Sequence, residues 1–182
     1  MAIKPTIYKF RISLSDLNQN YYDTLNLTIA LHPSETLERM MARVLAYCLN
    51  AYMNSQEHLS FTRGLCDVDE PDIWLRSLDD QVLLWIDIGE PSTDRIKKAT
   101  HIAEEVKIYS FNSKSGAWWE QEKNKLARLK TSIYQFQWEN IQSLARLVER
   151  TMDISVTLTA NSVYVAAPSG ECEIICNTLK EL

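Results

Sequence analysis

The stretch from Leu83 to Arg150 constrains the fold most, because short apolar runs alternate there with segments whose apolar residues recur every three or four positions. The predicted elements are, in order, a strand over 81–89, a helix carrying Ile96, Ala99, Ala103 and Val106 on its buried side, a strand over 106–112, a helix over 115–129, a strand over 132–137 and a helix over 140–150. Strands joined by helices in this order usually run parallel to one another in a sheet. The sequence therefore predicts parallel neighbours with crossover helices in this part of the chain.

Both ends of the chain instead alternate apolar and polar residues in a period of two, which is typical of half-buried strands. Residues 5–13 and 22–31 predict an antiparallel pair, joined by the turn-forming stretch 16–20. The C-terminal segments that predict an antiparallel hairpin and an edge strand are 154–160, 162–166 and 171–179. Together these patterns predict a single α/β (α+β) domain over residues 1–182, with a mixed central β-sheet flanked by helices.

The first long helix is predicted to begin after Ser34, whose side chain can cap its free N–H groups, and to end near Met53. The residues that define its buried face are Leu37, Met41, Val44 and Cys48. Helical geometry places Glu38 on the flank of that face and turns Glu35 further outward. A carboxylate on the flank could reach a site on the sheet, or it could be a solvated border residue.

Two further short runs, 72–77 and 81–89, flank the dipeptide Asp79-Asp80. Adjacent aspartates between apolar runs form turns, so a hairpin is the simplest arrangement of the two runs. The sequence thus predicts an antiparallel pair directly before the parallel part of the sheet.

The composition is that of an ordinary globular chain, with 46% hydrophobic and 24% charged residues. The 182 residues suit one core. They include no apolar span of about twenty residues and no cleavable leader, so we expect a cytoplasmic protein without a membrane segment. The four cysteines, Cys48, Cys66, Cys172 and Cys176, form neither a CxxC pair nor a disulfide framework, and we expect reduced, packed thiols.

The net charge of −5 counts against a protein that depends on non-specific phosphate contacts, since such proteins are usually basic. Nucleic acid stays a candidate partner, because a magnesium ion can neutralise an acidic site and basic residues can cluster locally. The three histidines lack zinc-site spacing, and the chain contains no GxGxxG, P-loop or GxSxG motif. We therefore expect no dinucleotide cofactor, no zinc site and no hydrolase triad.

Two carboxylates near predicted strand ends suggest a chemical site: Pro71-Asp72 precedes one run, and Asp87 lies near the end of the next. Asp87 shares a side of its strand with Trp85 and Leu83, which is a costly position for an isolated charge, so it needs a partner or a metal. Mg²⁺ takes oxygen ligands from one or two carboxylates. Asp72 and Asp87 are therefore the predicted metal ligands. The alternatives are that Asp87 is solvated or caps the next helix, and that Asp72 is only a turn residue.

Such a site also needs a positive group, and the helix that Ser92 or Thr93 is predicted to cap offers three. Neither Lys97 nor Lys98 falls on the buried stripe of this helix, yet both lie in its first two turns, near the strand end that carries the second carboxylate. Arg95 lies nearer the buried stripe and is the third candidate. The alternative for the two lysines is a surface position.

Five segments resemble the YaeQ family of small bacterial proteins: IKPTIYKFRISLSDLN, HPSETLERMMARVLAY, LSFTRGLCDVDEPDIWL, LWIDIGEPSTDRIKKA and YSFNSKSGAWW. The resemblance spans nearly the whole chain and implies a variation on the PD-(D/E)XK nuclease core, the restriction-endonuclease-like fold, in a family without an established activity. It places the first-helix acid of that core on Glu38, its Pro-Asp pair on Pro71-Asp72 and its second acid on Asp87. The lysine expected two residues later is Gly89, so Lys97 or Lys98 would have to supply the amine.

Two functions of different classes follow. The first is a Mg²⁺-dependent nuclease-like phosphodiesterase acting on DNA or RNA, with Mn²⁺ able to substitute. In it Asp72 and Asp87 hold the cation, Glu38 assists, and Lys97 or Lys98 stabilises the transition state. The alternative is a non-catalytic interaction or regulatory protein that keeps the nuclease scaffold and binds a protein partner. The glycine at the lysine position and the acidic balance favour the alternative.

Overall fold

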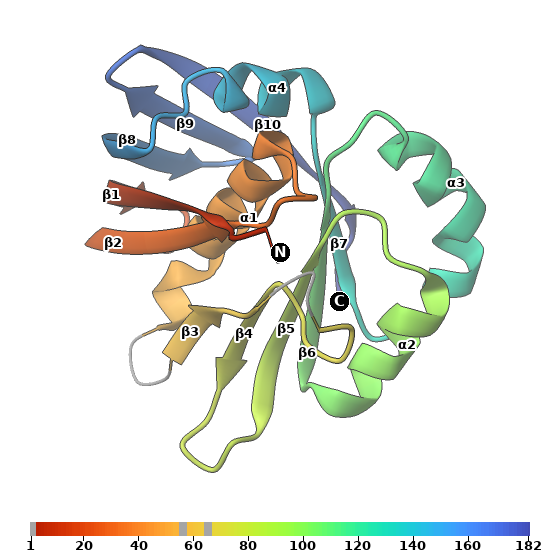
Figure 1. Ribbon diagram of the computed structural model, residues 1–182. Coiled ribbons are helices and arrows are strands. Elements are labelled where there is room, and N and C mark those ends of the chain that lie inside the picture. Colours follow the sequence, from red (N-terminus) through yellow and green to blue (C-terminus); the bar gives the residue numbers. More distant parts are fainter. Residues whose placement is uncertain (1–2, 55–57, 64–66) are drawn as a thin grey trace. The chain divides into compact units, whose positions relative to one another are not determined.

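A computed structural model describes residues 3–54, 58–63 and 67–182 (Figure 1). These residues form an α+β structure with four α-helices and ten strands in a mixed arrangement. The prediction of a mixed sheet with flanking helices is therefore confirmed. The chain divides into two compact units: the first joins Met1–Tyr52 with Gln137–Cys176, and the second joins Met53–Phe136 with Asn177–Leu182.

The first unit contains a sheet in the order β2-β1-β8-β9-β10. Its strands are β1 (Thr6–Asp16), β2 (Tyr21–Leu31), β8 (Thr151–Thr159), β9 (Ser162–Ala167) and β10 (Gly170–Lys180), whose last residues belong to the second unit. The pairs β1–β2, β8–β9 and β9–β10 are antiparallel, as predicted. By contrast β8 also pairs with β1 in parallel, so it lies inside this sheet rather than at its edge.

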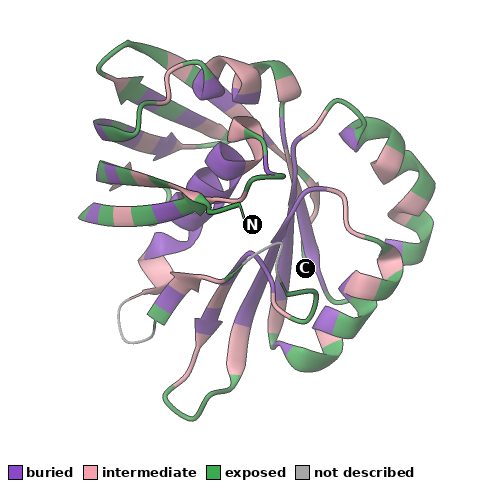
Figure 2. Ribbon diagram, viewed as in Figure 1, coloured by how far each residue is buried: buried purple, intermediate pink, exposed green. Residues whose placement is uncertain are grey.

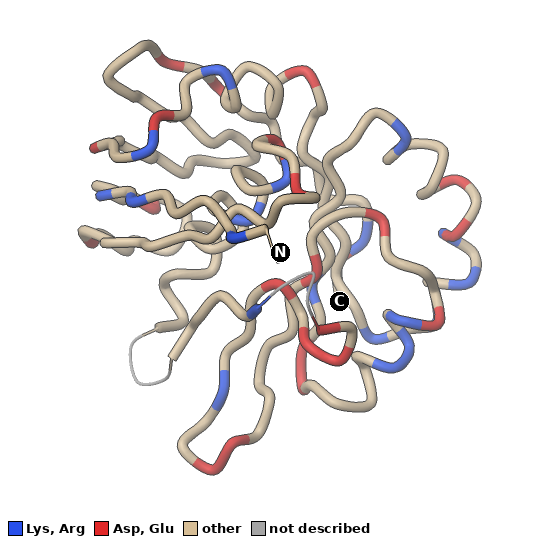
Figure 3. Tube along the Cα trace, viewed as in Figure 1, with Lys and Arg blue, Asp and Glu red and all other residues tan. Residues whose placement is uncertain are grey.

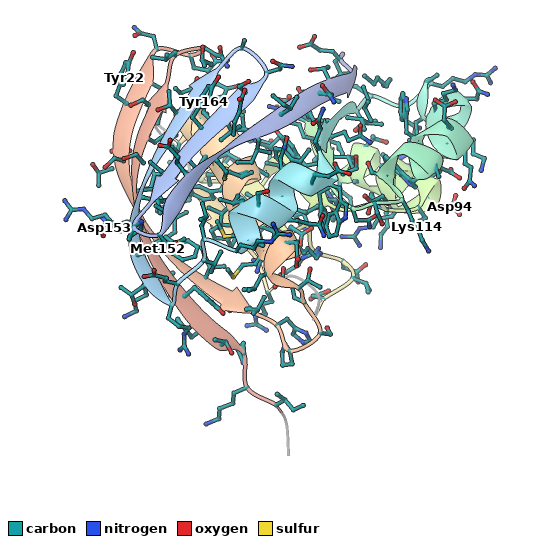
Figure 4. All side chains as sticks on the ribbon, turned by 90° about the horizontal axis from the view of Figure 1, so that it is seen from above. Tyr22, Asp94, Lys114, Met152, Asp153 and Tyr164 are labelled. Carbon is teal, nitrogen blue, oxygen red and sulfur yellow. The ribbon has the colours of Figure 1, made fainter. Side chains whose placement is uncertain are left out.

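In the strands of the first unit, the residues that alternate between apolar and polar in the sequence lie on opposite faces. In β8 the neighbours Met152 and Asp153 are buried and exposed respectively, and Figure 4 shows Asp153 projecting away from the sheet. The turn after β1 is closed by Asp16, whose Oδ1 accepts hydrogen bonds from the backbone N–H groups of Asn18 and Gln19, each at 3.0 Å. The predicted turn residues therefore act through their side chains.

Helices α1 (Leu37–Asn50) and α4 (Trp138–Ala145) pack together in the first unit. The predicted cap of α1 is wrong by two residues, because Thr36 Oγ1 accepts the hydrogen bond from Arg39 N at 3.2 Å. Ser34 instead makes a hydrogen bond with His32 Nδ1 at 2.7 Å. A 3₁₀ turn over Ala51–Met53 extends the helical segment to the predicted end.

Glu35 corrects a second expectation about this helix, since it is buried rather than turned outward. It precedes the first helical residue, so helical periodicity does not apply to it. Arg43 Nε and Nη2 donate to its two carboxylate oxygens at 2.7 and 2.8 Å, and Arg39 Nη1 adds a bond at 2.9 Å. This ion pair fixes the connection between β2 and α1.

The second unit has the strand order β7-β6-β5-β4-β3. Its strands are β3 (His58–Phe61), β4 (Ile73–Arg76), β5 (Val82–Ile88), β6 (Glu105–Ser110) and β7 (Ser132–Phe136). The helices α2 (Thr93–Ile102) and α3 (Ser115–Leu126) connect β5, β6 and β7, which run parallel to one another. Both the crossover arrangement and the predicted β4–β5 hairpin are confirmed.

The core of the second unit lies between α2, α3 and the parallel strands, where Figure 2 shows buried segments. Its fully buried residues include Ile96, Ala99, Val106, Ile108, Leu126 and Ile133. Three helices end earlier than predicted, at Ile102, Leu126 and Ala145. For α2 the reason is visible: Glu104 N donates to Val82 O at 3.1 Å, so the chain is already entering β6 and Val106 is a strand residue.

Three cysteines, Cys48, Cys172 and Cys176, are free thiols, and Cys66 lies outside the described residues. Of the helices in the described part of the chain, none is both long and apolar enough to span a membrane.

Candidate functional site

The two predicted carboxylates meet at the start of β4 and the end of β5, within the second unit. The antiparallel register begins with the pair Ile73 and Ile86, so Asp72 directly precedes the first paired residue of β4 and Asp87 directly follows its partner in β5. Asp72 N donates to Ile86 O at 3.0 Å, one position out of this register, and the charge of Asp72 acts on Asp87, so the two carboxyl groups lie near each other. Both side chains are buried, with residue exposures of 5% for Asp72 and 3% for Asp87. The hairpin thus places two buried acids close together at the end of β5.

The Pro71-Asp72 segment is held by hydrogen bonds on both sides. Ile88 N donates to Asp72 Oδ2 at 2.7 Å. Thr62 binds the other side, with its N–H donating to Asp72 O at 3.1 Å and its hydroxyl donating to Pro71 O. Asp72 is therefore fixed in a buried bend between two strands.

Asp87 forms a bidentate ion pair with Arg95, the third positive candidate. Arg95 Nε donates to Asp87 Oδ2 at 2.7 Å, and Nη2 donates to Oδ1 at 3.0 Å. The same guanidinium donates to the carbonyl oxygens of Val68 at 2.6 Å and Glu70 at 2.9 Å. It also lies 5.7 Å from the ring centre of Trp85. One arginine thus joins α2, the end of β5 and the acidic loop before β4.

The electrostatics of Asp87 reflect its buried position. Burial raises the pKa of this carboxyl above its ordinary value, and the negative charge of Asp72 raises it further. The hydrogen bonds and charge of Arg95 lower the pKa, without cancelling the effect of burial. Asp87 is therefore neither solvated nor a helix cap. Ser92 performs the capping role instead, accepting from Arg95 N at 3.2 Å.

Lys97 and Lys98 are both exposed on α2, as their positions off the buried stripe predicted. Lys98 Nζ lies 2.5 Å from Asp69 Oδ1, in an ion pair whose side chains are mostly exposed. Exposed pairs of this kind contribute little stability. Figure 3 shows the acidic loop before β4 and the basic residues of α2. In the structure the guanidinium of Arg95, and neither lysine, makes the hydrogen bonds to Asp87.

Gly89 stands where the resemblance led us to expect a lysine, and the backbone conformation there explains why the residue is a glycine. Its φ of +112° is a conformation that side-chain-bearing residues rarely adopt. Gly89 N donates to Tyr109 O at 2.8 Å, which ends β5 beside β6. The chain then turns into α2, whose third residue is Arg95. The turn between β5 and α2, which positions Arg95, therefore requires a glycine at this position.

Glu38 lies in the first turn of α1, half-buried as its flank position predicted, and belongs to the first unit. Its role as an assisting carboxylate stays a prediction. Within residues 3–54, 58–63 and 67–182, no group of three or more His, Cys, Asp or Glu side chains is arranged to hold a metal ion. The acidic site described here therefore consists of two carboxylates and a guanidinium.

The comparisons with known proteins cover almost the whole chain. The family model described as YaeQ protein matches residues 1–176. Two proteins described as uncharacterized protein YaeQ, from Escherichia coli (strain K12) and Salmonella typhi, are each 38% identical over 176 residues, which cover 96% of this chain and 95% of the relative.

Solved structures show the same similarity at the level of the fold. The crystal structure of YaeQ protein from Xanthomonas axonopodis pv. citri matches with a TM-score of 0.91 at 29% identity, covering 98% of this chain and 99% of that one. The YaeQ protein from Pseudomonas syringae gives a TM-score of 0.89 at 35% identity, covering 98% and 97%. Family model, relatives and structures agree, and the chain therefore belongs to the YaeQ family.

Proposed function

We propose that the second unit carries a Mg²⁺-dependent phosphodiesterase site of the PD-(D/E)XK type, with DNA or RNA as the substrate. The observation that carries the proposal is the pair of buried aspartates, Asp72 and Asp87, which lie close together where β4 begins and β5 ends. Two like charges that lie close together in a buried site repel each other. A divalent cation between them would relieve that repulsion, which supports a metal-binding role.

The residues present fit a magnesium ion in their chemistry. Mg²⁺ prefers oxygen ligands and commonly binds through one or two carboxylates, keeping water and phosphate oxygens as its other ligands. Arg95 uses one acceptor position on each oxygen of Asp87, and a carboxylate oxygen has two such positions. When bound, the cation would polarise the scissile phosphate and neutralise the charge that develops on it.

Arg95 takes the role that the prediction gave to Lys97 or Lys98. Its side chain is 30% exposed, so the guanidinium is accessible from solvent while it contacts Asp87. A guanidinium is always positively charged and attracts a phosphate. Arg95 would thus hold the substrate phosphate beside the two aspartates. Asp87 orients the guanidinium, and the carbonyls of Val68 and Glu70 fix its plane.

The test is cleavage of labelled single- and double-stranded DNA and RNA by the purified protein with Mg²⁺ or Mn²⁺. The proposal predicts cleavage that requires the metal, that is abolished in Asp87→Asn and Asp72→Asn, and that is retained in Asp79→Asn. Asp79 is a suitable control because it is an exposed aspartate in the turn of the same hairpin. Cleavage that persists in Asp87→Asn would contradict the proposed site.

One observation favours the alternative of a non-catalytic interaction or regulatory protein on a nuclease-derived scaffold. Arg95 already binds both oxygens of Asp87, and Lys98 is paired with Asp69. In this second candidate the arginine replaces the cation and holds the acidic loop in place. It predicts that the parent protein cleaves none of the four substrates and that Arg95→Met, which frees the carboxylate, binds Mn²⁺ more tightly than the parent.

A further inference from the structure

The sheet of the first unit carries a hollow on its solvent-facing side, which the proposed function does not use. The hollow has a volume of about 410 Å³ and lies across β8, β9 and β10. The lining residues that alternate toward this side of the strands are Ser155, Thr157, Tyr164, Ala166, Glu171 and Glu173. A volume of this size is typical of sites that hold small molecules.

The strand register explains why the surface is hollowed here. Directly paired residues form two rows across the three strands, Ser155–Ala166–Glu171 and Thr157–Tyr164–Glu173. Paired residues project from the same face of a sheet, and the small side chains of Ser155 and Ala166 leave space beside longer neighbours. Tyr164, labelled in Figure 4, is 45% exposed, so its ring is accessible from solvent. Small residues thus form the floor of the hollow, and a tyrosine and two glutamates form its rim.

The charge of the lining selects the kind of ligand. Glu171 and Glu173 are exposed carboxylates, and Glu173 Oε1 accepts a hydrogen bond from Ser162 Oγ at 2.7 Å. Among the residues that line the hollow, all of which the structure describes, none is a lysine, an arginine or a histidine. Carboxylates only accept hydrogen bonds, and the hydroxyl groups nearby can accept as well. The lining therefore suits a ligand that is positively charged and donates hydrogen bonds.

The arrangement of the two glutamates favours an organic cation over a metal ion. In the part of the chain that the structure describes, these carboxylates belong to no group of three or more side chains that could hold a metal. Glu171 and Glu173 are two residues apart on one strand, which separates their Cα atoms by about 7 Å. Two ammonium groups joined by a short aliphatic chain match such a pair. The face of a tyrosine ring, such as that of Tyr164, also attracts an ammonium group.

We propose that the hollow binds an aliphatic diamine, with one ammonium group at Glu171 and the other at Glu173. The methylene chain lies against Ala166 and the ring of Tyr164, which supply the apolar part of the lining. This site belongs entirely to the first unit. It is separate from the aspartates of the second unit, and the proposal holds or fails independently of any cleavage of nucleic acid.

The probe for the test is butane-1,4-diamine, titrated into the purified protein by calorimetry without added metal. Butan-1-amine, with one ammonium group, and butane-1,4-diol, with none, are the matched comparison ligands. We expect the diamine to bind, the monoamine to bind at least about threefold more weakly, and the diol not to bind, since each ion pair lost removes part of the attraction. Absence of diamine binding would overturn the proposal. Equal binding of the monoamine would refute the two-carboxylate site, and equal binding of the diol would refute charge as its basis.

Variants locate the binding site. Glu171→Gln and Glu173→Gln should each weaken diamine binding by about three- to tenfold, because each replaces a charged acceptor with a neutral one. Glu149→Gln is the matched control, since it removes the same charge from an exposed glutamate of the first unit outside the hollow. It should bind like the parent, and so should Asp87→Asn. Unchanged affinity in both hollow variants, or lost affinity in Asp87→Asn, would place the diamine elsewhere and contradict the proposal.

Discussion

At the scale of single residues, Arg95 is the residue whose importance the sequence predicted least well. Sequence reasoning named it third, because helix geometry places a side chain on a stripe but does not say how far a long side chain reaches. The structure shows its guanidinium binding Asp87 and two backbone carbonyls. The burial of Asp87 was predictable, since the strand period puts it with Trp85, and its exposure of 3% agrees.

Replacing Arg95 with methionine should destabilise the protein, because Asp87 would stay buried without the guanidinium. Breaking a fully buried pair costs about 3–5 kcal/mol. Since the Arg95 side chain is 30% exposed, we expect about 1–3 kcal/mol here. Urea unfolding of Arg95→Met measures it. The double variant Arg95→Met with Asp87→Asn should recover part of the loss, and additive losses would show that the two residues do not interact.

The cysteines give a second prediction at this scale. Burial raises the pKa of Cys48 and of Cys176 to about 12, so both thiols should resist alkylation in the folded protein at neutral pH. Cys172 is half-buried on an exposed face, and burial raises its pKa less. Mass spectrometry after timed treatment with iodoacetamide should find Cys172 modified first of the three. Equal rates in the native protein would contradict the burial described here.

At the scale of elements, the sequence predicts well whether a segment is a helix or a strand, and predicts poorly the residues at which the element begins and ends. The alternation of strands and helices and the β4–β5 hairpin are local patterns, and the structure confirms them. The start of α1 was misplaced because two capping residues, Ser34 and Thr36, stand close together, and the choice between them depends on which backbone N–H groups become free. The end of α2 depends on pairing with β5, which no local pattern reveals.

The cap of α1 can be tested by two matched substitutions. Thr36→Ala should lower the free energy of unfolding by about 1 kcal/mol, because it removes the acceptor for Arg39 N. Ser34→Ala removes only an exposed bond to His32 and should change stability by less than about 0.5 kcal/mol. Thermal unfolding of the two variants gives the comparison. A larger loss of unfolding free energy for Ser34→Ala than for Thr36→Ala would show that Ser34 is the cap, as the sequence predicted.

At the scale of the whole molecule, the chain builds each unit from segments that are distant in sequence. The parallel pairing of β1 with β8 joins residues such as Ile12 and Ile154. A period of two in the sequence shows which side chains share a face of a strand, but it does not show which strand lies next to it. The resemblance to the YaeQ family, by contrast, was predictable from short segments and is confirmed over residues 1–176. The nuclease-like chemistry stays a proposal that depends on two aspartates and one arginine.

The most direct test of the proposed metal site is titration of Mn²⁺ into the metal-free protein by calorimetry, with Asp87→Asn and the exposed control Asp79→Asn beside the parent. We expect one binding event in the parent and in Asp79→Asn, and its loss in Asp87→Asn, because in the proposed site Asp72 and Asp87 together would hold the cation. Equal binding in the parent and Asp87→Asn would place the metal elsewhere and contradict the site. Absence of binding in all three would contradict the metal-dependent function and leave Arg95 as the cation of this site.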